Sequence, residues 1–432
     1  MKFINFDSII KKIRKNHIRK LLENFFSLSL LQISGYVFPI FTLPYLANVL
    51  GIEKFGLVAF SSAIIIYFQT IVDYGFNFTA TRDIAKNKRN YSILSDIYSR
   101  VLWSKFLLLL ISLLLLILLL IFIPQLNNIR ALLLISFLIL PGHILFTDWL
   151  FQGLEEMKFI TILNVISKSV FTFSVFIFIK SESDYLLQPL FLAIGLFVSG
   201  LATQFIIKRK YNIIIKKASL KSIITTIKGS TDVFINQLFP NLYNSFSILL
   251  LGYFGGVQSN GIFEAAAKFV NFSQQFTIVI SRTFFPYLSR NIEKHSVFSK
   301  INILISAIIS ITLFLLAPYL INTFFNKDYY PAILVLRILS ISIIFLSLIS
   351  TFGTNYLILQ KHERLLRNIT MFVSIFGFFI SWPLIYYYNV IGAAVTILTT
   401  RAVFGLSIVV AARQIIKKKM SESINPQIPI NN

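Results

Sequence analysis

Long apolar stretches follow one another along almost the whole chain, and short polar segments separate them. Each stretch is about 20 residues long, which is the length of helix needed to cross the hydrocarbon core of a bilayer. The runs lie at 25–47, 55–76, 101–123, 131–151, 159–180, 186–207, 231–253, 260–285, 300–324, 331–357, 368–388 and 391–412. This pattern predicts an all-α polytopic membrane protein with about twelve transmembrane helices.

The composition supports this interpretation and excludes several classes of protein. Hydrophobic residues make up 56% of the 432 residues, charged residues 13%, and the mean hydropathy is +0.77. The chain has no cysteine, so disulfides and thiolate metal sites are excluded. The four histidines are scattered, and no nucleotide-binding or zinc-protease motif is present. We therefore expect a transporter rather than an enzyme, with no catalytic residues, no metal and no cofactor.

The basic residues are distributed unevenly between the predicted loops. The formal net charge is +23, which in a soluble protein would suggest nucleic acid, but here the position of each charge matters more. With a cytoplasmic N-terminus, the inside segments hold about 30 Lys and Arg and the outside loops hold Lys54, Arg130, Lys180 and Lys327. Such an excess on one side follows the positive-inside rule. It predicts that both termini are cytoplasmic.

Two motifs recur at nearly the same spacing, which indicates an internal duplication. Gln152 and Glu155 are echoed by Gln360 and Glu363, 208 residues later, and "GIEKFG" at 51–56 is echoed by "GVQSNG" at 256–261. An even number of helices per repeat gives two parallel lobes, related by a pseudo-twofold axis along the membrane normal, which is an architecture of transporters rather than of channels or membrane enzymes. We predict a basic cytoplasmic segment at 1–24, an N-lobe at 25–207, a basic cytoplasmic connector at 208–230, a C-lobe at 231–412 and a cytoplasmic tail at 413–432.

Polar side chains deep in the predicted helices are the candidates for a substrate cavity, because charges are costly at membrane depth and tend to face water or a partner. The deep cations outnumber the deep acids, which favours an anionic substrate, although structural pairing is the alternative. Amide side chains in the seventh and eighth helices could contact sugars. The candidate cavity residues are Lys168, Lys268, Arg337, Arg401, Asn236, Asn241, Asn244 and Asn271.

The acids and the charges at helix ends allow two interpretations. Glu264 and Asp148 are candidates for a gate or a proton-coupled acid, yet Glu264 stands four residues before Lys268 and could form a plain salt bridge with it. Asp73 and Arg282 lie near predicted cytoplasmic helix ends. They could line a cytoplasmic mouth, or they could cap a helix and snorkel.

Four segments resemble the polysaccharide transporter family, the Wzx-type flippases of O-antigen and capsule repeat units in the MOP superfamily. They are "PIFTLPYLANVLGIEKFGLVAF" at 39–60, "DYGFNFTATRDIAKNK" at 73–88, "WLFQGLEEMKFI" at 149–160 and "GIFEAAAKFV" at 261–270. The resemblance implies translocation of an undecaprenyl-diphosphate-linked oligosaccharide from the inner to the outer leaflet of a bacterial inner membrane by alternating access.

The resemblance also implies coupling to a proton or cation gradient, together with a polysaccharide polymerase and a chain-length regulator as partners. It suggests that Arg82 meets an incoming diphosphate at the cytoplasmic mouth, with simple topological anchoring as the alternative. Two other functions remain open. A multidrug or cation antiporter of the same superfamily would require more acidic lobes, and a polysaccharide polymerase or ligase would require longer outer loops.

Overall fold

The computed structural model describes the backbone of residues 6–424 and the side chains of 35, 38, 39, 41–281, 283–285 and 287–417. The side chains of the predicted basic segment 1–24, that of Arg282 and those of the tail beyond 417 lie outside the described residues. The described backbone is helical over nearly its whole length and contains no strand. The predicted all-α multi-span architecture is confirmed.

Eight helices within the described part of the chain are long and apolar enough to cross a membrane. Two of the longest helices are interrupted, α1 (Phe6–Asp73) by non-helical backbone at Gly51 and α16 (Glu363–Ile424) at Asn389. At 68 and 62 residues, each is long enough for two spans. The two predicted runs at 231–253 and 260–285 lie on helices that are not among these eight candidate spans, because those helices are shorter or more polar. Each of the twelve apolar runs therefore corresponds to helical structure.

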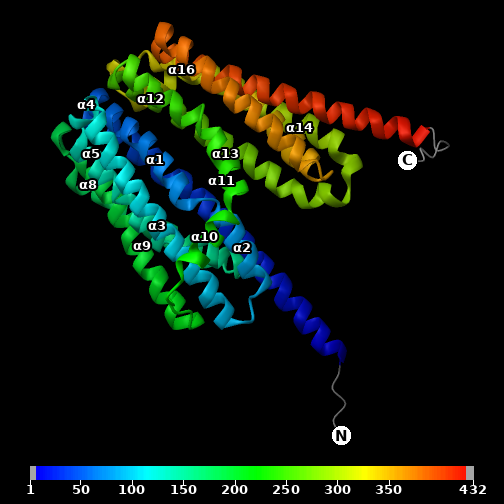
Figure 1. The fold of residues 1–432 in the computed structure, drawn as a ribbon. Coiled ribbons are helices and arrows are strands. Elements are labelled where there is room, and N and C mark those ends of the chain that lie inside the picture. Colours follow the sequence, from blue (N-terminus) through cyan, green and yellow to red (C-terminus); the bar gives the residue numbers. More distant parts are fainter. Residues whose placement is uncertain (1–5, 425–432) are drawn as a thin grey trace. The chain divides into compact units, whose positions relative to one another are not determined.

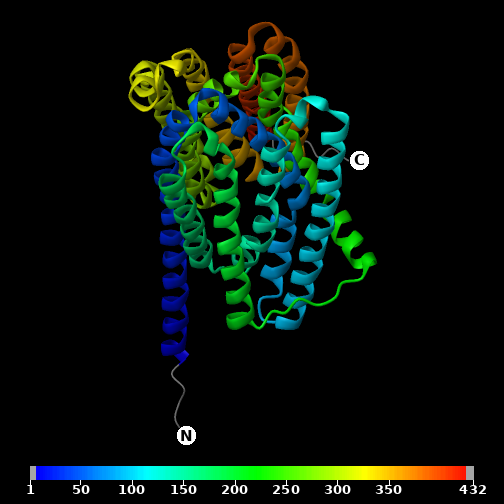
Figure 2. The same ribbon diagram turned by 90° about the vertical axis from the view of Figure 1, so that its left-hand side faces the viewer.

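The chain divides into two compact units (Figures 1 and 2). Unit 1 comprises Met1–Leu50 and Ile65–Ile235. Besides most of α1, its helices are α2 (Phe76–Lys86), α3 (Tyr91–Phe122), α4 (Pro124–Asn127), α5 (Arg130–Phe137), α6 (Ile139–Leu145), α7 (Asp148–Gly153), α8 (Met157–Phe178), η1 (Glu182–Leu186), α9 (Leu187–Tyr211), α10 (Leu220–Lys228) and the start of α11 (Thr231–Asn241).

Unit 2 comprises Gly51–Ile64 and Asn236–Asn432. It contains the end of α11 and then α12 (Asn244–Phe254), α13 (Val257–Arg290), η2 (Ile292–Lys294), α14 (His295–Phe324), η3 (Lys327–Tyr329), α15 (Ala332–Leu348), η4 (Ile349–Ile358, a π-helix) and α16. The division differs from the predicted lobes, since residues 51–64 belong to unit 2, whereas the connector 208–230 and residues 231–235 belong to unit 1.

The backbone repeats two unusual turns at the spacing of the predicted duplication. Gly51 and Gly256 both have positive φ with extended ψ, a conformation open essentially to glycine alone. Glu155 and Lys361 are both left-handed, and each is followed by a residue whose N–H closes the preceding helix on the carbonyl five residues earlier, at 2.9 Å and 2.8 Å. These pairs stand 205 and 206 residues apart. The echoes in the sequence thus mark equivalent helix boundaries.

Within unit 2, Gly56 and Gly261 form a reciprocal helix crossing. A methyl group at Gly56 would lie 1.8 Å from the carbonyl oxygen of Val257, and one at Gly261 would lie 2.5 Å from the carbonyl oxygen of Ile52. Ile52 and Val257 are also 205 residues apart, so they occupy equivalent positions in the two repeats. The glycine of each repeat therefore packs against the equivalent carbonyl group of the other repeat. Only the absence of a side chain allows these backbones to approach so closely.

Replacing Gly56 with alanine should therefore destabilise the protein, although alanine normally favours a helix. The added methyl group would clash with backbone atoms, which cannot move aside as a flexible side chain can. We therefore expect the free energy of unfolding to fall by about 1–3 kcal/mol or more, which is typical of overpacking. The melting temperature of the purified protein in detergent measures it. Gly229→Ala is the matched control, because Gly229 has φ −66° and a Cβ there would be no closer than 3.4 Å to any atom. Equal melting temperatures for the two variants would contradict the crossing.

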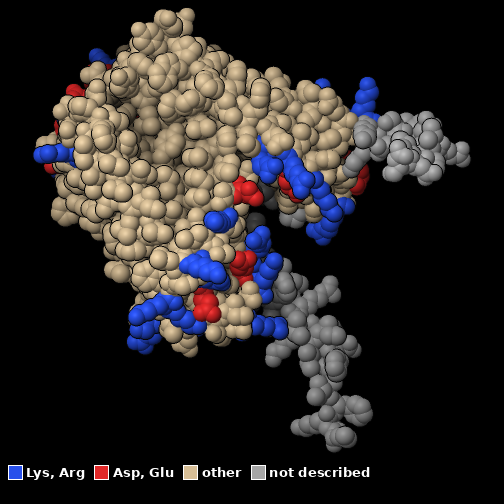
Figure 3. All heavy atoms as spheres, in the orientation of Figure 1, with Lys and Arg blue, Asp and Glu red and all other residues tan. Residues whose placement is uncertain are grey.

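The segment "YGF" at 74–76 forms the turn that ends α1 and begins α2. Tyr74 and Gly75 are both left-handed, and Phe76 enters the core of unit 1 fully buried. That core gathers residues of α2, α3, α7 and α9 around Trp149. On the face drawn in Figure 3, Lys and Arg gather at the end of unit 1 where α2 and α10 lie, while uncharged atoms cover its long sides. This arrangement is that expected of helices spanning a bilayer.

Candidate functional site

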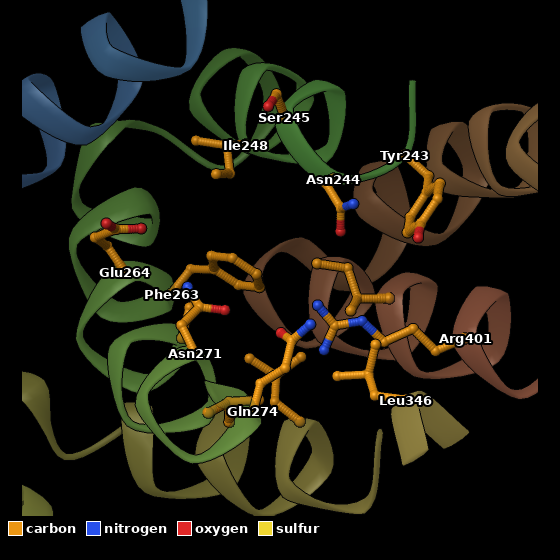
Figure 4. A pocket seen from close by; sticks show the side chains of 14 residues that line it. Tyr243, Asn244, Ser245, Ile248, Phe263, Glu264, Asn271, Gln274, Leu346 and Arg401 are labelled. Atoms are coloured by element: carbon orange, nitrogen blue, oxygen red, sulfur yellow. The ribbon is translucent and has the colours of Figure 1, made fainter. Parts of the chain in front are cut away.

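A pocket of about 310 Å³ lies within unit 2, between α12, α13, α15 and α16 (Figure 4). This volume is at the lower end of the range typical of small-molecule sites. Polar and apolar side chains share the lining, which consists of Tyr243, Asn244, Ser245, Ile248, Phe263, Glu264, Ala267, Val270, Asn271, Gln274, Leu339, Leu346, Ile397 and Arg401.

Arg401 is the cation of this pocket. It stands on α16 three turns beyond the break at Asn389, and its residue is only 8% exposed. One terminal nitrogen, Nη1, donates to the hydroxyl of Ser342 at 2.8 Å, while Nε has no hydrogen-bond partner among the described residues. The guanidinium extends from α16 into the pocket, facing α13 (Figure 4). A buried guanidinium with free donors is suited to bind the oxygens of an anion in a planar, bidentate manner.

Amide side chains face the same space. Asn271 and Gln274 belong to α13 (Figure 4). Asn244 is the first residue of α12, directly after the helical structure is interrupted at residues 242–243. Pro240 lies inside α11 near this break, and its carbonyl accepts a hydrogen bond from Nδ2 of Asn244 at 3.1 Å. Amides can both donate and accept, so they are suited to sugar hydroxyls. The pocket therefore combines one anion-binding group with several neutral hydrogen-bonding groups.

Glu264 lines the pocket, but Lys268 compensates its charge. Their side chains form an ion pair one helical turn apart on α13. Such an i, i+4 pair is the geometry anticipated from the spacing of the two residues. With Glu264 neutralised in this way, Arg401 supplies the remaining charge among the described residues that line the pocket. An anion is therefore better matched to the pocket than a cation.

The structure separates the other candidate cavity residues from this pocket. Arg337 is directed to α14, where its guanidinium lies 5.4 Å from the ring centre of Phe314, because α15 presents this position to its neighbour rather than to the pocket. Asn236 and Asn241 belong to α11 and do not contribute to the lining. Lys168 lies in unit 1, where a Cβ at Gly35 would be 3.4 Å from its Nζ.

The residues expected at a cytoplasmic mouth occupy different environments. Asp73 is buried within unit 1, where it accepts a hydrogen bond from Nζ of Lys105 at 2.7 Å and contacts His143. It belongs to an internal ionic cluster rather than to a mouth, since two partners hold its carboxylate inside. The side chain of Arg82 is 64% exposed, and its Nε lies 3.6 Å from Oδ1 of Asp83. Asp148, the second candidate acid, is the first residue of α7 and accepts from the N–H of Trp149.

The sequence did not identify three of the polar residues that the structure places at or near these sites. Gln274 and Ser342 were missed in the pocket region, and His143 was missed in unit 1. A polar residue in an apolar run was the available signal for each of them, but serines and glutamines are too common in such runs for that signal to select these positions. Tyr243, which packs near Arg401, also lines the pocket.

Comparison with known proteins assigns the fold and the family. The polysaccharide biosynthesis protein family matches residues 21–292. Two curated proteins bear the name "Putative O-antigen transporter". The one from Shigella dysenteriae is 30% identical over 397 residues, covering 90% of this chain and all of that protein. The one from Escherichia coli K12 is 29% identical over 389 residues, covering 88% and 94%.

Two solved structures share the fold at low identity. The lipid II flippase MurJ in an inward closed conformation matches with a TM-score of 0.71 at 16% identity, over 92% of this chain and 87% of MurJ. An outward-facing MATE family multidrug resistance transporter of the MOP superfamily matches with a TM-score of 0.55 at 15% identity, over 91% and 96%. The described helices and the shared fold define a multi-span helical membrane protein. The chain belongs to the polysaccharide biosynthesis protein family.

Proposed function

We propose that this protein is a flippase that moves undecaprenyl-diphosphate-linked oligosaccharide repeat units from the inner to the outer leaflet of a bacterial inner membrane. The repeat units would serve synthesis of O-antigen, capsule or a related surface polysaccharide. The observation that carries the proposal is the pocket in unit 2, in which the buried guanidinium of Arg401 faces amide side chains. Membership of the family and the names of the two curated relatives support it.

The chemistry of such a substrate suits this pocket. A diphosphate carries negative charge that a guanidinium binds through charge-assisted hydrogen bonds. The sugars attached to it offer hydroxyl groups, which the amides of Asn244, Asn271 and Gln274 can bind. The volume of about 310 Å³ accommodates the polar head rather than the whole glycolipid, so the polyprenyl tail would remain in the bilayer. Polymerase and chain-length regulator would then act on the exported units.

The leaflet distribution of lipid-linked repeat units tests this function directly. A strain that lacks the gene is compared with the same strain carrying it on a plasmid, and the exposed glycan is measured in spheroplasts by lectin binding or by a glycosidase. We expect the units to accumulate on the inner leaflet without the protein and to reach the outer leaflet with it. Full outward exposure in the deletion strain would refute the proposal, and loss of resistance to cationic dyes there would favour drug efflux instead.

A further inference from the structure

A second cavity, of about 470 Å³, lies within unit 1 and plays no part in the pocket of unit 2. It is enclosed between α3 and the extended segment 212–219, which joins α9 to α10. In Figure 2 this segment runs from the end of α9 past the lower end of α3 to α10. Asp96 and Arg100 of α3 line the cavity from one side, and Lys216 and Lys217 line it from the other.

Hydrogen bonds to side chains of α3 hold the segment in place. The backbone N–H of Lys216 donates to the hydroxyl of Ser99 at 2.8 Å, and its carbonyl oxygen accepts from Nε1 of Trp103 at 3.1 Å. The ammonium of Lys216 pairs with Asp96, with Nζ 2.8 Å from Oδ1. The backbone and the side chain of Lys216 are thus both fixed to α3. The walls of the cavity are therefore formed before any ligand binds.

Two cations of the cavity are left to bind a ligand. Three bases and one acid line it, and Lys216 already compensates the acid, Asp96. Arg100 is exposed and donates from Nε to the carbonyl oxygen of Asp96 at 3.3 Å, while its terminal nitrogens have no partner among the described residues. Lys217 is also exposed and forms no ion pair with a described residue. The excess of two positive charges favours an anion.

An uncovered apolar face of α3 leads away from the cavity. Arg100, Trp103, Phe106 and Leu110 follow one another at spacings of three or four residues, so they lie on one side of the helix. Trp103 is 39% exposed, Phe106 45% and Leu110 48%. Tryptophan favours the boundary between membrane and water, because its ring is apolar and its N–H is polar. The cavity therefore lies at the level of lipid headgroups, and the apolar face continues from it into the bilayer.

We propose that this cavity binds the headgroup of an anionic phospholipid of the surrounding bilayer. Arg100 and Lys217 hold the phosphate through charge-assisted hydrogen bonds, and the acyl chains lie along Trp103 and Phe106. A zwitterionic lipid offers the same phosphate, but its cationic group finds no free acid in the lining, since Lys216 occupies Asp96. A headgroup with net negative charge, such as that of phosphatidylglycerol, is therefore favoured. The site does not depend on what the protein transports.

Lipid titration followed by native mass spectrometry tests the site on the full chain in detergent. Phosphatidylglycerol and phosphatidylcholine with identical acyl chains are added separately, and the bound fraction gives the affinity of each. We expect phosphatidylglycerol to bind about fivefold more tightly, the effect of one net charge near a basic surface. The double variant Arg100→Gln with Lys217→Gln should lose this preference. Its affinity for phosphatidylglycerol should fall by about 10- to 100-fold, because hydrogen bonds to charged groups are lost.

The matched control is the double variant Lys208→Gln with Arg209→Gln. It removes the same two charges from the last turn of α9, outside the cavity, and should leave the affinity for phosphatidylglycerol unchanged. All four side chains are exposed, so neither double variant should impair folding. Equal losses in the two double variants would overturn the proposal, because they would indicate attraction by net charge alone. Equal affinities of the wild type for the two lipids would also overturn it.

Hydrogen exchange shows where the lipid binds. The wild type is placed in nanodiscs of phosphatidylcholine alone or of an equal mixture with phosphatidylglycerol, and exchange of the backbone amides at 217–222 is compared. We expect phosphatidylglycerol to slow exchange there in the wild type and not in Arg100→Gln with Lys217→Gln. Unchanged exchange in the wild type would contradict the site.

Inorganic phosphate distinguishes a lipid site from a site for a free anion. It offers the charge of the headgroup without acyl chains, so at the same concentration it should not displace phosphatidylglycerol from the protein in detergent. Displacement by inorganic phosphate would show that the acyl chains contribute nothing and would overturn the proposal.

Discussion

Replacing Arg401 with glutamine should abolish surface polysaccharide while the protein remains folded in the membrane. The guanidinium is the unpaired cation of the pocket, with Nε free of any hydrogen-bond partner among the described residues. Hydrogen bonds to a charged group contribute about 1.5–3 kcal/mol each, so losing even one lowers binding of a diphosphate by about 10- to 100-fold. Export is measured as surface polymer in the complemented deletion strain, and the amount of protein by immunoblot.

Arg337→Gln is the matched control for this experiment. It removes the same charge from the same unit, but its guanidinium packs on Phe314 outside the pocket. Its loss should cost about 0.5–2 kcal/mol of stability through the cation–π contact and leave export near that of the wild type. Equal loss of export in both variants would indicate a general need for positive charge, and full export in Arg401→Gln would remove the pocket from the transport pathway.

Arg401→Lys refines the result. Lysine keeps the charge but replaces the planar set of donors with a single ammonium, so it cannot bind two oxygens of a phosphate in parallel. We expect export between that of the wild type and that of Arg401→Gln. A lysine variant with full activity would show that the pocket requires charge alone. The two substitutions together separate the contribution of the charge from that of the bidentate geometry.

The helical, multi-span character of the chain could be predicted because a bilayer demands it. Every spanning segment must be apolar over about 20 residues, so each leaves a local signal in the sequence. The duplication was also readable, since the boundary motifs around Gln152 and Gln360 recur within the chain. These signals did not reveal the crossing of the helices at Gly56 and Gly261. The two glycines are some 200 residues apart, and only the three-dimensional structure shows that they lie close together.

The sites were only partly predictable, because a helix that is apolar on all sides gives no indication of which face is inward. Arg337 and Arg401 look alike in sequence, yet one packs on a phenylalanine and the other enters the pocket. Likewise, Asp73 and His143 stand 70 residues apart, and nothing local connects them. The charge of a buried residue could be recognised from the sequence, whereas its partner could not.

Replacing Lys105 with methionine should destabilise the protein more than any other single substitution considered for the ionic cluster. The variant keeps most of the side-chain volume but leaves Asp73 without its ammonium partner, which is 2.7 Å away in the native structure. Removing one partner of a buried ion pair typically costs about 3–5 kcal/mol. Thermal unfolding in detergent, followed by fluorescence-detected size-exclusion chromatography, measures the effect. Lys158→Met is the control, because Lys158 pairs with Glu156 while its side chain is 47% exposed, and such pairs contribute about 0–1 kcal/mol.

The double variant Asp73→Asn with Lys105→Met shows whether the loss comes from charge or from packing. If the unpaired carboxylate is responsible, the second substitution should recover much of the stability lost in the first, since no uncompensated charge then remains. Additive losses would instead indicate that both side chains act by filling space. A Lys105→Met variant as stable as Lys158→Met would mean that water reaches Asp73.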